Sequence, residues 1–322
     1  MTRRKSAFLA IALSLGLVLA ACGDDPTVDS ADDESGETTD EAGGGFTVTL
    51  SADAIEMPDE VAGGVIEVTI KSDLEEADVN FSKVPDGATD ADFRAAIASA
   101  TTGGPIPEII EATTGVTGKS QTIELPEGSY IAWADPQSGE EGGEGEEGSP
   151  PAAEGEEAAQ GEEVEGDEAD PSAFVTKAFT VTAGEDGELP DTGSSITARD
   201  YSFDIDVEAG GEKFTFRNEG PDQVHHVVLL NFGTVAPDDV EANLEAFLQS
   251  EGEGEQPEAF KDLDQSKLFG TGESTVVTPG LGVTADASFE AGTYAAVCFL
   301  QDRAGGPPHV FGKGMRTVFT VD

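Results

Sequence analysis

The sequence predicts an all-β protein built from two tandem β-sandwiches, each with one short inserted helix. Two observations predict this fold class. Short segments rich in Val, Ile, Phe and Thr recur between Gly and Pro residues, as they do in sandwiches and barrels. An ordered series of segments also occurs twice along the chain, which indicates two copies of one fold.

The strand signals fall into two groups, one in each half of the chain. In the first half we expect strands at 46–50, 65–70, 121–125 and 129–133. In the second half we expect them at 212–217, 224–230, 286–289, 293–299 and 316–321. A helix is expected in each half, at 89–100 and 237–249, because each segment opens with Thr or Pro followed by Asp.

The two halves align with each other in the same order. Gly63-Gly64 followed by VIEVTI matches Gly210-Gly211 followed by EKFTFR. Residues 126–130 (PEGSY) match 290–294 (EAGTY), and 177–181 (KAFTV) match 317–321 (TVFTV). This alignment sets Ala134 opposite Cys298, Val79 opposite His225 and Val175 opposite Met315.

The N-terminus has the features of an export signal. Arg3, Arg4 and Lys5 precede an apolar run from residue 7 to 21, which is too short to be a spanning helix. The ending Leu-Ala-Ala-Cys22 resembles the lipobox of bacterial lipoproteins. It implies a signal peptide at 1–21, an acylated Cys22 inserted in the lipid bilayer, and a location on the extracytoplasmic face of the bacterial cell membrane. The alternative is an ordinary secretory signal with a chance cysteine.

The charge is strongly acidic, with 66 Asp and Glu against 16 Lys and Arg and a net charge of −50. Such a chain repels phosphate backbones, so nucleic acid is excluded as a partner. Residues 23–45 and 138–170 contain no basic residue and little apolar surface, which predicts disorder. The predicted organisation is a tether at 22–45, a first domain at 46–184 with a disordered acidic insertion at about 138–170, a linker at 185–195 and a second domain at 196–322.

The residues with metal-ligating chemistry are few and lie mostly in the second domain. The chain has two cysteines and three histidines. If Cys22 is acylated, Cys298 is left as an unpaired thiol in an oxidising compartment. One Cys with two His and a Met is the ligand set of a blue-copper site, and Cys298 is followed by His309 and Met315.

Three segments of the second domain carry a family resemblance. Asn218-Glu219-Gly220 leads to the apolar run VHHVVL at 224–229. The segment GTYAAVC ends at Cys298, and Gly314-Met315 runs into the last strand. Together these segments resemble the cupredoxin family, whose members are small Greek-key β-sandwiches that bind one copper ion. The resemblance covers most of residues 196–322 and implies that His225, Cys298 and His309 are equatorial ligands and Met315 the axial one.

The second domain also departs from the family pattern. Ten residues separate Cys298 from His309, where the family has a handful, and five separate His309 from Met315. His226 occupies a position where the family commonly has Asn. His225 faces the site in the expected strand register, but a slip of one residue would turn His226 inward instead.

The leading functional hypothesis is a membrane-anchored cupredoxin-like lipoprotein with one copper ion for one-electron transfer. It is not expected to be an enzyme, because a multicopper oxidase needs more than three histidines. One alternative is a metal-free structural or partner-binding sandwich, and another is copper storage or delivery. Thiol reactivity should separate them: a ligating Cys298 would be shielded only with metal present, and a core Cys always. The redox or surface protein partner is not identified by the sequence.

Overall fold

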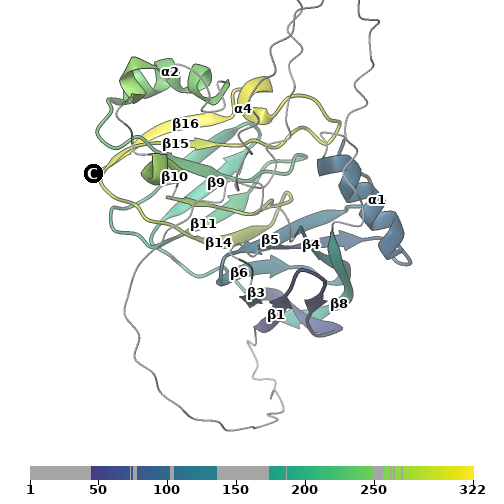
Figure 1. Cartoon of the computed structure of the whole chain (residues 1–322). Helices are drawn as coiled ribbons and strands as arrows, with labels where there is room; N and C mark the ends of the chain where they lie inside the picture. The colour runs from purple at the N-terminus through teal and green to yellow at the C-terminus, as the bar shows by residue number, and fades with distance from the viewer. Residues whose placement is uncertain are drawn as a thin grey trace, which may run out of the picture.

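The structure is a computed structural model that describes residues 45–72, 74, 78–101, 105–135, 174–185, 187–249, 257–261, 263, 265–269 and 271–322 (Figure 1). The predicted signal peptide, Cys22, the tether up to residue 44 and the acidic insertion at 138–170 lie outside these residues. Within the described part, no helix has the length and apolar character needed to cross a membrane.

The N-terminal half, here called the N-terminal sandwich, consists of eight named strands and one helix among the described residues. They are β1 (Phe46–Leu50), β2 (Ile55–Glu56), β3 (Glu60–Ser72), β4 (Asp78–Val84), α1 (Asp90–Thr101), β5 (Ala112–Thr117), β6 (Ser120–Leu125), β7 (Gly128–Ala134) and β8 (Val175–Glu185). The expected helix is confirmed at this place. The side chain of Thr89 accepts a hydrogen bond from the backbone N–H of Asp92 (3.2 Å) and so caps its first turn.

The C-terminal sandwich follows and carries more helical segments. Its elements are β9 (Ser195–Arg199), β10 (Ser202–Asp206), β11 (Lys213–Asn218), β12 (Val228–Asn231), α2 (Pro237–Gln249), the 3₁₀ helix η2 (Glu258–Phe260), α3 (Gln265–Phe269), β13 (Gly272–Glu273), β14 (Gly282–Asp286), β15 (Gly292–Val297), α4 (His309–Gly312) and β16 (Arg316–Val321). Helix α2 has the bounds that the sequence predicts.

The strands of the described residues form two hydrogen-bonded sheets. The smaller sheet has the order β13-β12-β15-β16, and it faces β10-β9-β11-β14 across the core of the C-terminal sandwich. The larger sheet continues from β14 to β6 through the pair Val283 and Ile123, so it runs into the N-terminal sandwich. A single apolar cluster spans both halves, from Val48 and Phe81 to Phe216 and Tyr294. The predicted all-β class and the paired sandwich architecture are therefore confirmed.

Side chains of β15 alternate between two apolar layers. Tyr294, Ala296 and Cys298 point into the sandwich core. Ala295 and Val297 point the other way and pack in the cluster that contains α2, which covers this sheet in Figure 1. Because both faces are covered, the strand is apolar throughout and reads as a continuous run instead of an alternating one.

The same arrangement occurs at β7 in the N-terminal sandwich. Tyr130, Ala132 and Ala134 belong to the shared core, while Ile131 and Trp133 pack with α1 on the other face. The two strands also make equivalent closing contacts. The hydroxyl of Tyr130 donates to the Pro126 carbonyl at 2.8 Å, and that of Tyr294 donates to the Glu290 carbonyl at 2.7 Å.

Strand pairing fixes the alignment of the halves more finely than sequence comparison did. Tyr130 pairs with Phe179 and Tyr294 with Phe319, which puts Ala134 and Val175 in the places of Cys298 and Met315, as expected. The alignment of Val79 with His225 is wrong by two residues. Lys83 pairs with Tyr130, and Asn231 with Tyr294, so Val79 corresponds to Val227.

Three further expectations about strands need correction. VIEVTI aligns with KFTFRN and not with EKFTFR, because a one-residue shift is needed to bring buried positions opposite buried positions. The strand expected at 286–289 lies earlier, at Gly282–Asp286. The strand expected at 224–230 begins only at Val228, because Val227 exchanges hydrogen bonds with Ser274 instead of extending the ladder.

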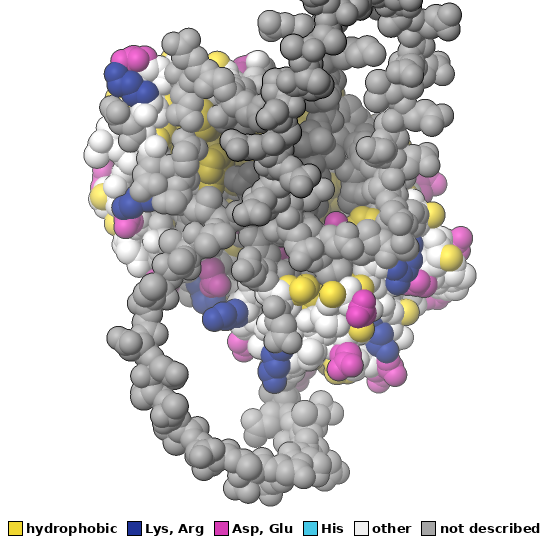
Figure 2. All heavy atoms as spheres, in the orientation of Figure 1, with side chains coloured by type: hydrophobic (Ala, Val, Ile, Leu, Met, Phe, Trp, Pro, Cys, Tyr) yellow, Lys and Arg dark blue, Asp and Glu magenta, His cyan; other side chains and the backbone are white. Residues whose placement is uncertain are grey.

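Charges on the described surface are mixed. In Figure 2 the acidic and basic side chains are interspersed over the lower part of the molecule, where the N-terminal sandwich lies. Arg217 and Glu124 form an ion pair of 3.0 Å that links the two halves beside the shared sheet. The long stretches without basic residues that the sequence shows at 23–45 and 138–170 fall almost wholly outside the described residues.

The closing contact of Tyr130 yields a stability prediction. Replacing Tyr130 with Phe removes the hydrogen bond to Pro126 and keeps the ring, so we expect a loss of about 1 kcal/mol in the free energy of unfolding. Urea unfolding followed by the fluorescence of Trp133, the single tryptophan, measures it. Lys119→Ala, at an exposed turn residue, serves as the control, and a Tyr130→Phe midpoint equal to that of the control would contradict the prediction.

Candidate metal centre

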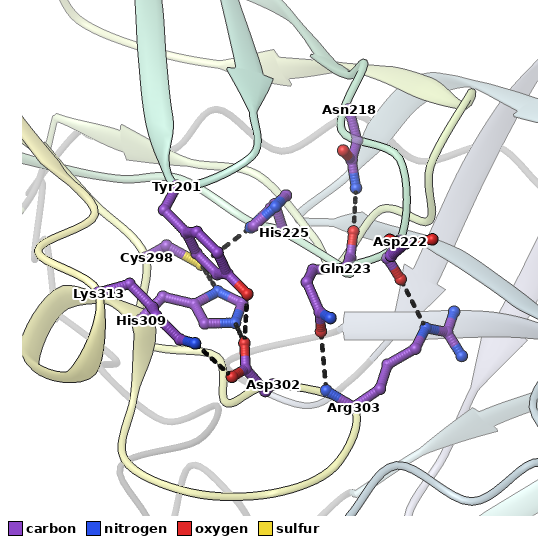
Figure 3. A network of polar contacts seen from close by, with 10 residues as sticks. All are labelled: Tyr201, Asn218, Asp222, Gln223, His225, Cys298, Asp302, Arg303, His309 and Lys313. Atoms are coloured by element: carbon purple, nitrogen blue, oxygen red, sulfur yellow. Dashed lines mark hydrogen bonds and ion pairs between the residues drawn. The ribbon is translucent and has the colours of Figure 1, made fainter.

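Three buried donor side chains meet at one end of the C-terminal sandwich. The Cys298 sulfur lies 3.8 Å from His225 Nδ1 and 3.5 Å from His309 Nδ1. One donor atom from each residue lies within 4.8 Å of the others, and all three residues have no exposed surface. Figure 3 shows the two imidazoles and the sulfur turned toward one another. The sequence thus predicted three residues that the fold brings together from distant segments.

Cys298 reaches this place through strand alternation. It is the residue after β15, in phase with the inward-facing Tyr294 and Ala296. Its backbone N–H donates to the Met315 carbonyl at 3.3 Å, and its carbonyl accepts from Val310 N–H at 2.9 Å. The cysteine therefore holds the segments that carry the third donor and the methionine.

The ten-residue loop from 299 to 308, here called the ligand loop, returns to the site by backbone hydrogen bonds. His309 N–H donates to the Leu300 carbonyl at 2.7 Å, which closes the loop at its base. Gly305 and Gly306 turn the chain with φ values of 81° and 121°, which other residues rarely adopt. Pro308 then occupies the N-cap position of the short helix α4, in which His309 is the first residue. The unusual loop length is thus compatible with a donor at His309.

Met315 lies beside the three donors. Its N–H donates to the His309 carbonyl at 3.0 Å, and its side chain is fully buried in the same apolar cluster as Cys298. Backbone hydrogen bonds therefore join Met315 to both Cys298 and His309. A role as axial ligand remains a prediction.

The two neighbouring histidines have different environments. His225 pairs through its backbone with Val277 and turns its ring toward Cys298. His226 turns away: its Nε2 accepts a hydrogen bond from Phe299 N–H at 2.9 Å. His226 thus connects the His225 segment to the residue after Cys298. The geometry supports the expected register, with His225 facing the cysteine.

Three residues around His309 were missed by sequence reasoning. Asp302 lies 3.2 Å from His309 Nε2 through Oδ1, and it accepts hydrogen bonds from Tyr201 (2.8 Å) and Lys313 (2.9 Å). The Tyr201 ring packs edge-on against both histidines, with centroids 5.1 Å from His309 and 6.3 Å from His225. Nothing distinguishes Asp302 from the other 65 acidic residues in the sequence, although its place between Cys298 and His309 is a weak signal.

Burial controls the protonation of the donors. It lowers the pKa of His225 to about 4, and it lowers the pKa of His309, although Asp302 opposes that shift. Burial raises the pKa of the Cys298 thiol to about 12. At neutral pH the site therefore holds two uncharged imidazoles and a protonated thiol.

Asp302 remains a carboxylate in this environment. Burial favours a higher pKa for Asp302, but the hydrogen bonds from Lys313 and Tyr201 outweigh that effect and hold the pKa below its usual value. A carboxylate that accepts from Nε2 fixes His309 in the tautomer whose Nδ1 lone pair faces the sulfur. This is how a protein commonly orients a metal-binding imidazole.

The donor set fits a copper ion. A thiolate and two imidazoles with a nearby thioether are the ligands that copper prefers, and a bound cation would stabilise the thiolate that burial alone disfavours. In addition, His225 Nε2 is buried and has no hydrogen-bond partner within the described part of the chain. The Tyr201 ring packs edge-on against this imidazole, whose Nδ1 faces the Cys298 sulfur at 3.8 Å.

Comparisons with known proteins find copper proteins among the solved structures, with low sequence identity and low TM-scores. No family model matches the chain, and no curated protein matches it. Among solved structures, auracyanin from Roseiflexus castenholzii is 21% identical over 40% of this chain and 94% of its own, with a TM-score of 0.25. Auracyanin A, a "blue" copper protein from Chloroflexus aurantiacus, is 20% identical over 40% and 96%, with a TM-score of 0.24. A Cu-containing nitrite reductase from Thermus scotoductus is 11% identical over 87% and 62%, with a TM-score of 0.20. At these values the likeness says nothing about function.

Complete burial of Cys298 changes what thiol chemistry can decide. The Cys298 sulfur has no exposed surface even without a metal, so protection from thiol reagents does not distinguish a copper ligand from a core cysteine. A direct test for bound metal is needed to choose between these two hypotheses.

Burial of Cys298 does predict its reactivity in the metal-free protein. In a Cys22→Ser background at pH 8, we expect a thiol reagent to label native Cys298 more than about 100-fold slower than in urea, because the thiol is buried and protonated. Absorbance of the released chromophore follows the reaction, and Cys298→Ser gives the blank. Equal rates in the native and unfolded protein would contradict the buried geometry.

Proposed function

We propose that the C-terminal sandwich binds one copper ion through His225, Cys298 and His309, with Met315 as the axial ligand, and serves as a one-electron carrier. The observation that supports it best is the meeting of three fully buried donors within 4.8 Å.

Copper is favoured over other metals by the ligand chemistry. Thiolate and thioether are soft ligands that suit copper, whereas calcium and magnesium require oxygen. Zinc is also bound by Cys and His, but the buried thioether beside the site adds a ligand type that zinc sites do not use. When bound, copper would supply a reversible one-electron couple between Cu(I) and Cu(II).

The surrounding residues support electron transfer because they hold the donors in place. Asp302 fixes the His309 ring, and His226 fixes the backbone after Cys298. Fixed donors change little between oxidation states, which keeps the reorganisation cost of electron transfer low. Full burial of the donors favours a resident ion over copper delivery, which requires an accessible ligand.

We further propose that the chain is a lipid-anchored protein on the extracytoplasmic face of a bacterial membrane, tethered through acylated Cys22. The N-terminal sandwich would be a sister copy without a metal site, since Ala134 and Val175 occupy the places of Cys298 and Met315. With three histidines in the whole sequence, the protein is proposed as a carrier and not as a multicopper oxidase.

A visible absorption spectrum tests the copper site. The mature chain in a Cys22→Ser background is mixed with Cu(II), and we expect an intense thiolate-to-copper band that disappears in Cys298→Ser. Replacing His309 with Gln should weaken or shift the band, because it removes a second donor. If no band forms and Cu(I) also fails to bind, the copper proposal is wrong and the metal-free sandwich is the better reading.

The contact of Asp302 with His309 predicts a loss of metal affinity. In Asp302→Ala we expect Cu(I) to bind about 10–100-fold more weakly, because an outer carboxylate that orients a ligand contributes by that amount. Competition with a coloured Cu(I) chelator measures the affinity. Asp206→Ala, at an exposed residue of β10, is the matched control, and unchanged affinity in Asp302→Ala would show that the carboxylate does not orient the ligand.

A further inference from the structure

We propose that the N-terminal sandwich braces the metal centre, holding both histidine-bearing segments in place through residues 105–117. This segment, here called the brace, consists of residues 105–111 and the strand β5 that follows them. The role of the brace rests on the proposed copper function, but the hydrogen bonds that form it are present in the structure without a metal.

The brace reaches the ligand loop at Arg303. Ile106 N–H donates to the Arg303 carbonyl at 3.1 Å, and the Arg303 guanidinium donates to the Ile110 carbonyl at 3.4 Å. Gly305 is also close, since a side chain added there would meet Pro105 at 3.7 Å. The middle of the loop between Cys298 and His309 thus rests on the N-terminal sandwich.

Arg303 also reaches the turn that leads to His225. Its backbone N–H donates to Gln223 Oε1 at 2.8 Å, and its Nε donates to the Asp222 carbonyl at 3.2 Å, as Figure 3 shows. Among the described residues, its side chain donates hydrogen bonds to two backbone carbonyls. Directional hydrogen bonds to fixed carbonyls position the loop more firmly than an ion pair with a mobile side chain would.

The brace holds the His225 segment by a second route. His225 exchanges backbone hydrogen bonds with Val277 at 2.8 and 3.1 Å. The next residue, Thr278, donates its N–H to the Thr113 carbonyl at 3.0 Å and accepts from Thr113 N–H through its hydroxyl at 2.6 Å. Thr275 adds a hydrogen bond to the Gly115 carbonyl at 3.1 Å. The segment 275–278, whose Val277 pairs with His225, is therefore itself hydrogen-bonded to β5.

These contacts explain how a long ligand loop can present a fixed donor. A ten-residue loop with two glycines at positive φ loses much conformational freedom when it is ordered. Each hydrogen bond from the brace offsets part of that cost, because it is made between groups already fixed in a sheet or a closed turn. The proposed role of the N-terminal sandwich is therefore to preorganise His225 and His309 of the C-terminal sandwich.

The test removes one donor of the brace in the mature chain. Ile106→Pro deletes the N–H that bonds Arg303, and Ile106→Val is the matched control because it trims the side chain and keeps the N–H. Amide hydrogen exchange in the metal-free protein reports on residues 299–309. We expect exchange there about fivefold faster in Ile106→Pro than in Ile106→Val, the change expected for one lost hydrogen bond. The unfolding free energy followed by Trp133 should fall in Ile106→Pro by about 1 kcal/mol relative to Ile106→Val, the amount that one hydrogen bond contributes, and a much larger loss would indicate misfolding.

A second variant tests the other route and guards against misfolding of the first. Thr278→Val removes the hydroxyl that accepts from Thr113, and we expect faster exchange at residues 222–228. Cu(I) affinity should fall about fivefold in both variants. If wild-type protein binds no copper, the proposed function fails while the exchange data still judge the brace. If exchange is unchanged in both Ile106→Pro and Thr278→Val, the brace is wrong even where copper binds.

Discussion

The pair of backbone hydrogen bonds at Cys298 is the constraint on which the metal centre depends. Its N–H bonds the Met315 carbonyl, and its carbonyl bonds Val310 N–H. The end of β15, the start of α4 and the segment before β16 are thereby fixed to one residue. A sulfur placed by strand alternation thus meets a histidine and a methionine that follow it after a long loop.

The buried histidine nitrogens at this site need hydrogen-bond partners to offset the loss of water. Asp302 satisfies the outer nitrogen of His309, and the N–H of Phe299 satisfies His226. His225 is different, because its Nε2 has no partner within the described residues. An unsatisfied buried nitrogen costs stability, and such a cost is commonly retained at functional sites. In the proposed copper site Nδ1 of His225 would bind the ion, which accounts for a buried imidazole at this position and leaves its Nε2 without a partner among the described residues.

The two sandwiches share the same arrangement of strands and helices but have different proposed roles. In both, an inward-facing tyrosine closes a strand with a hydrogen bond to a carbonyl four residues earlier, and a helix covers the outer face. In the proposed arrangement the C-terminal sandwich binds the metal, and the N-terminal sandwich positions the loops that carry its ligands. The continuous sheet from β14 to β6 makes this possible, because it fixes the halves edge to edge.

The sequence by itself determined the all-β class, the repeated order of elements and the residues His225, Cys298 and His309 as candidate donors, because alternation, turn residues and rare residue types are local signals. Helix α2 was predicted to the residue, since its Pro and Asp residues mark the start directly. Only the tertiary structure decided between His225 and His226, corrected the alignment of Val79, and revealed Asp302, Tyr201 and Arg303. Those contacts join residues that lie up to 193 positions apart, as between the Arg303 guanidinium and the Ile110 carbonyl. No local pattern encodes such a meeting, because it depends on how the packed sheets bring distant loops together.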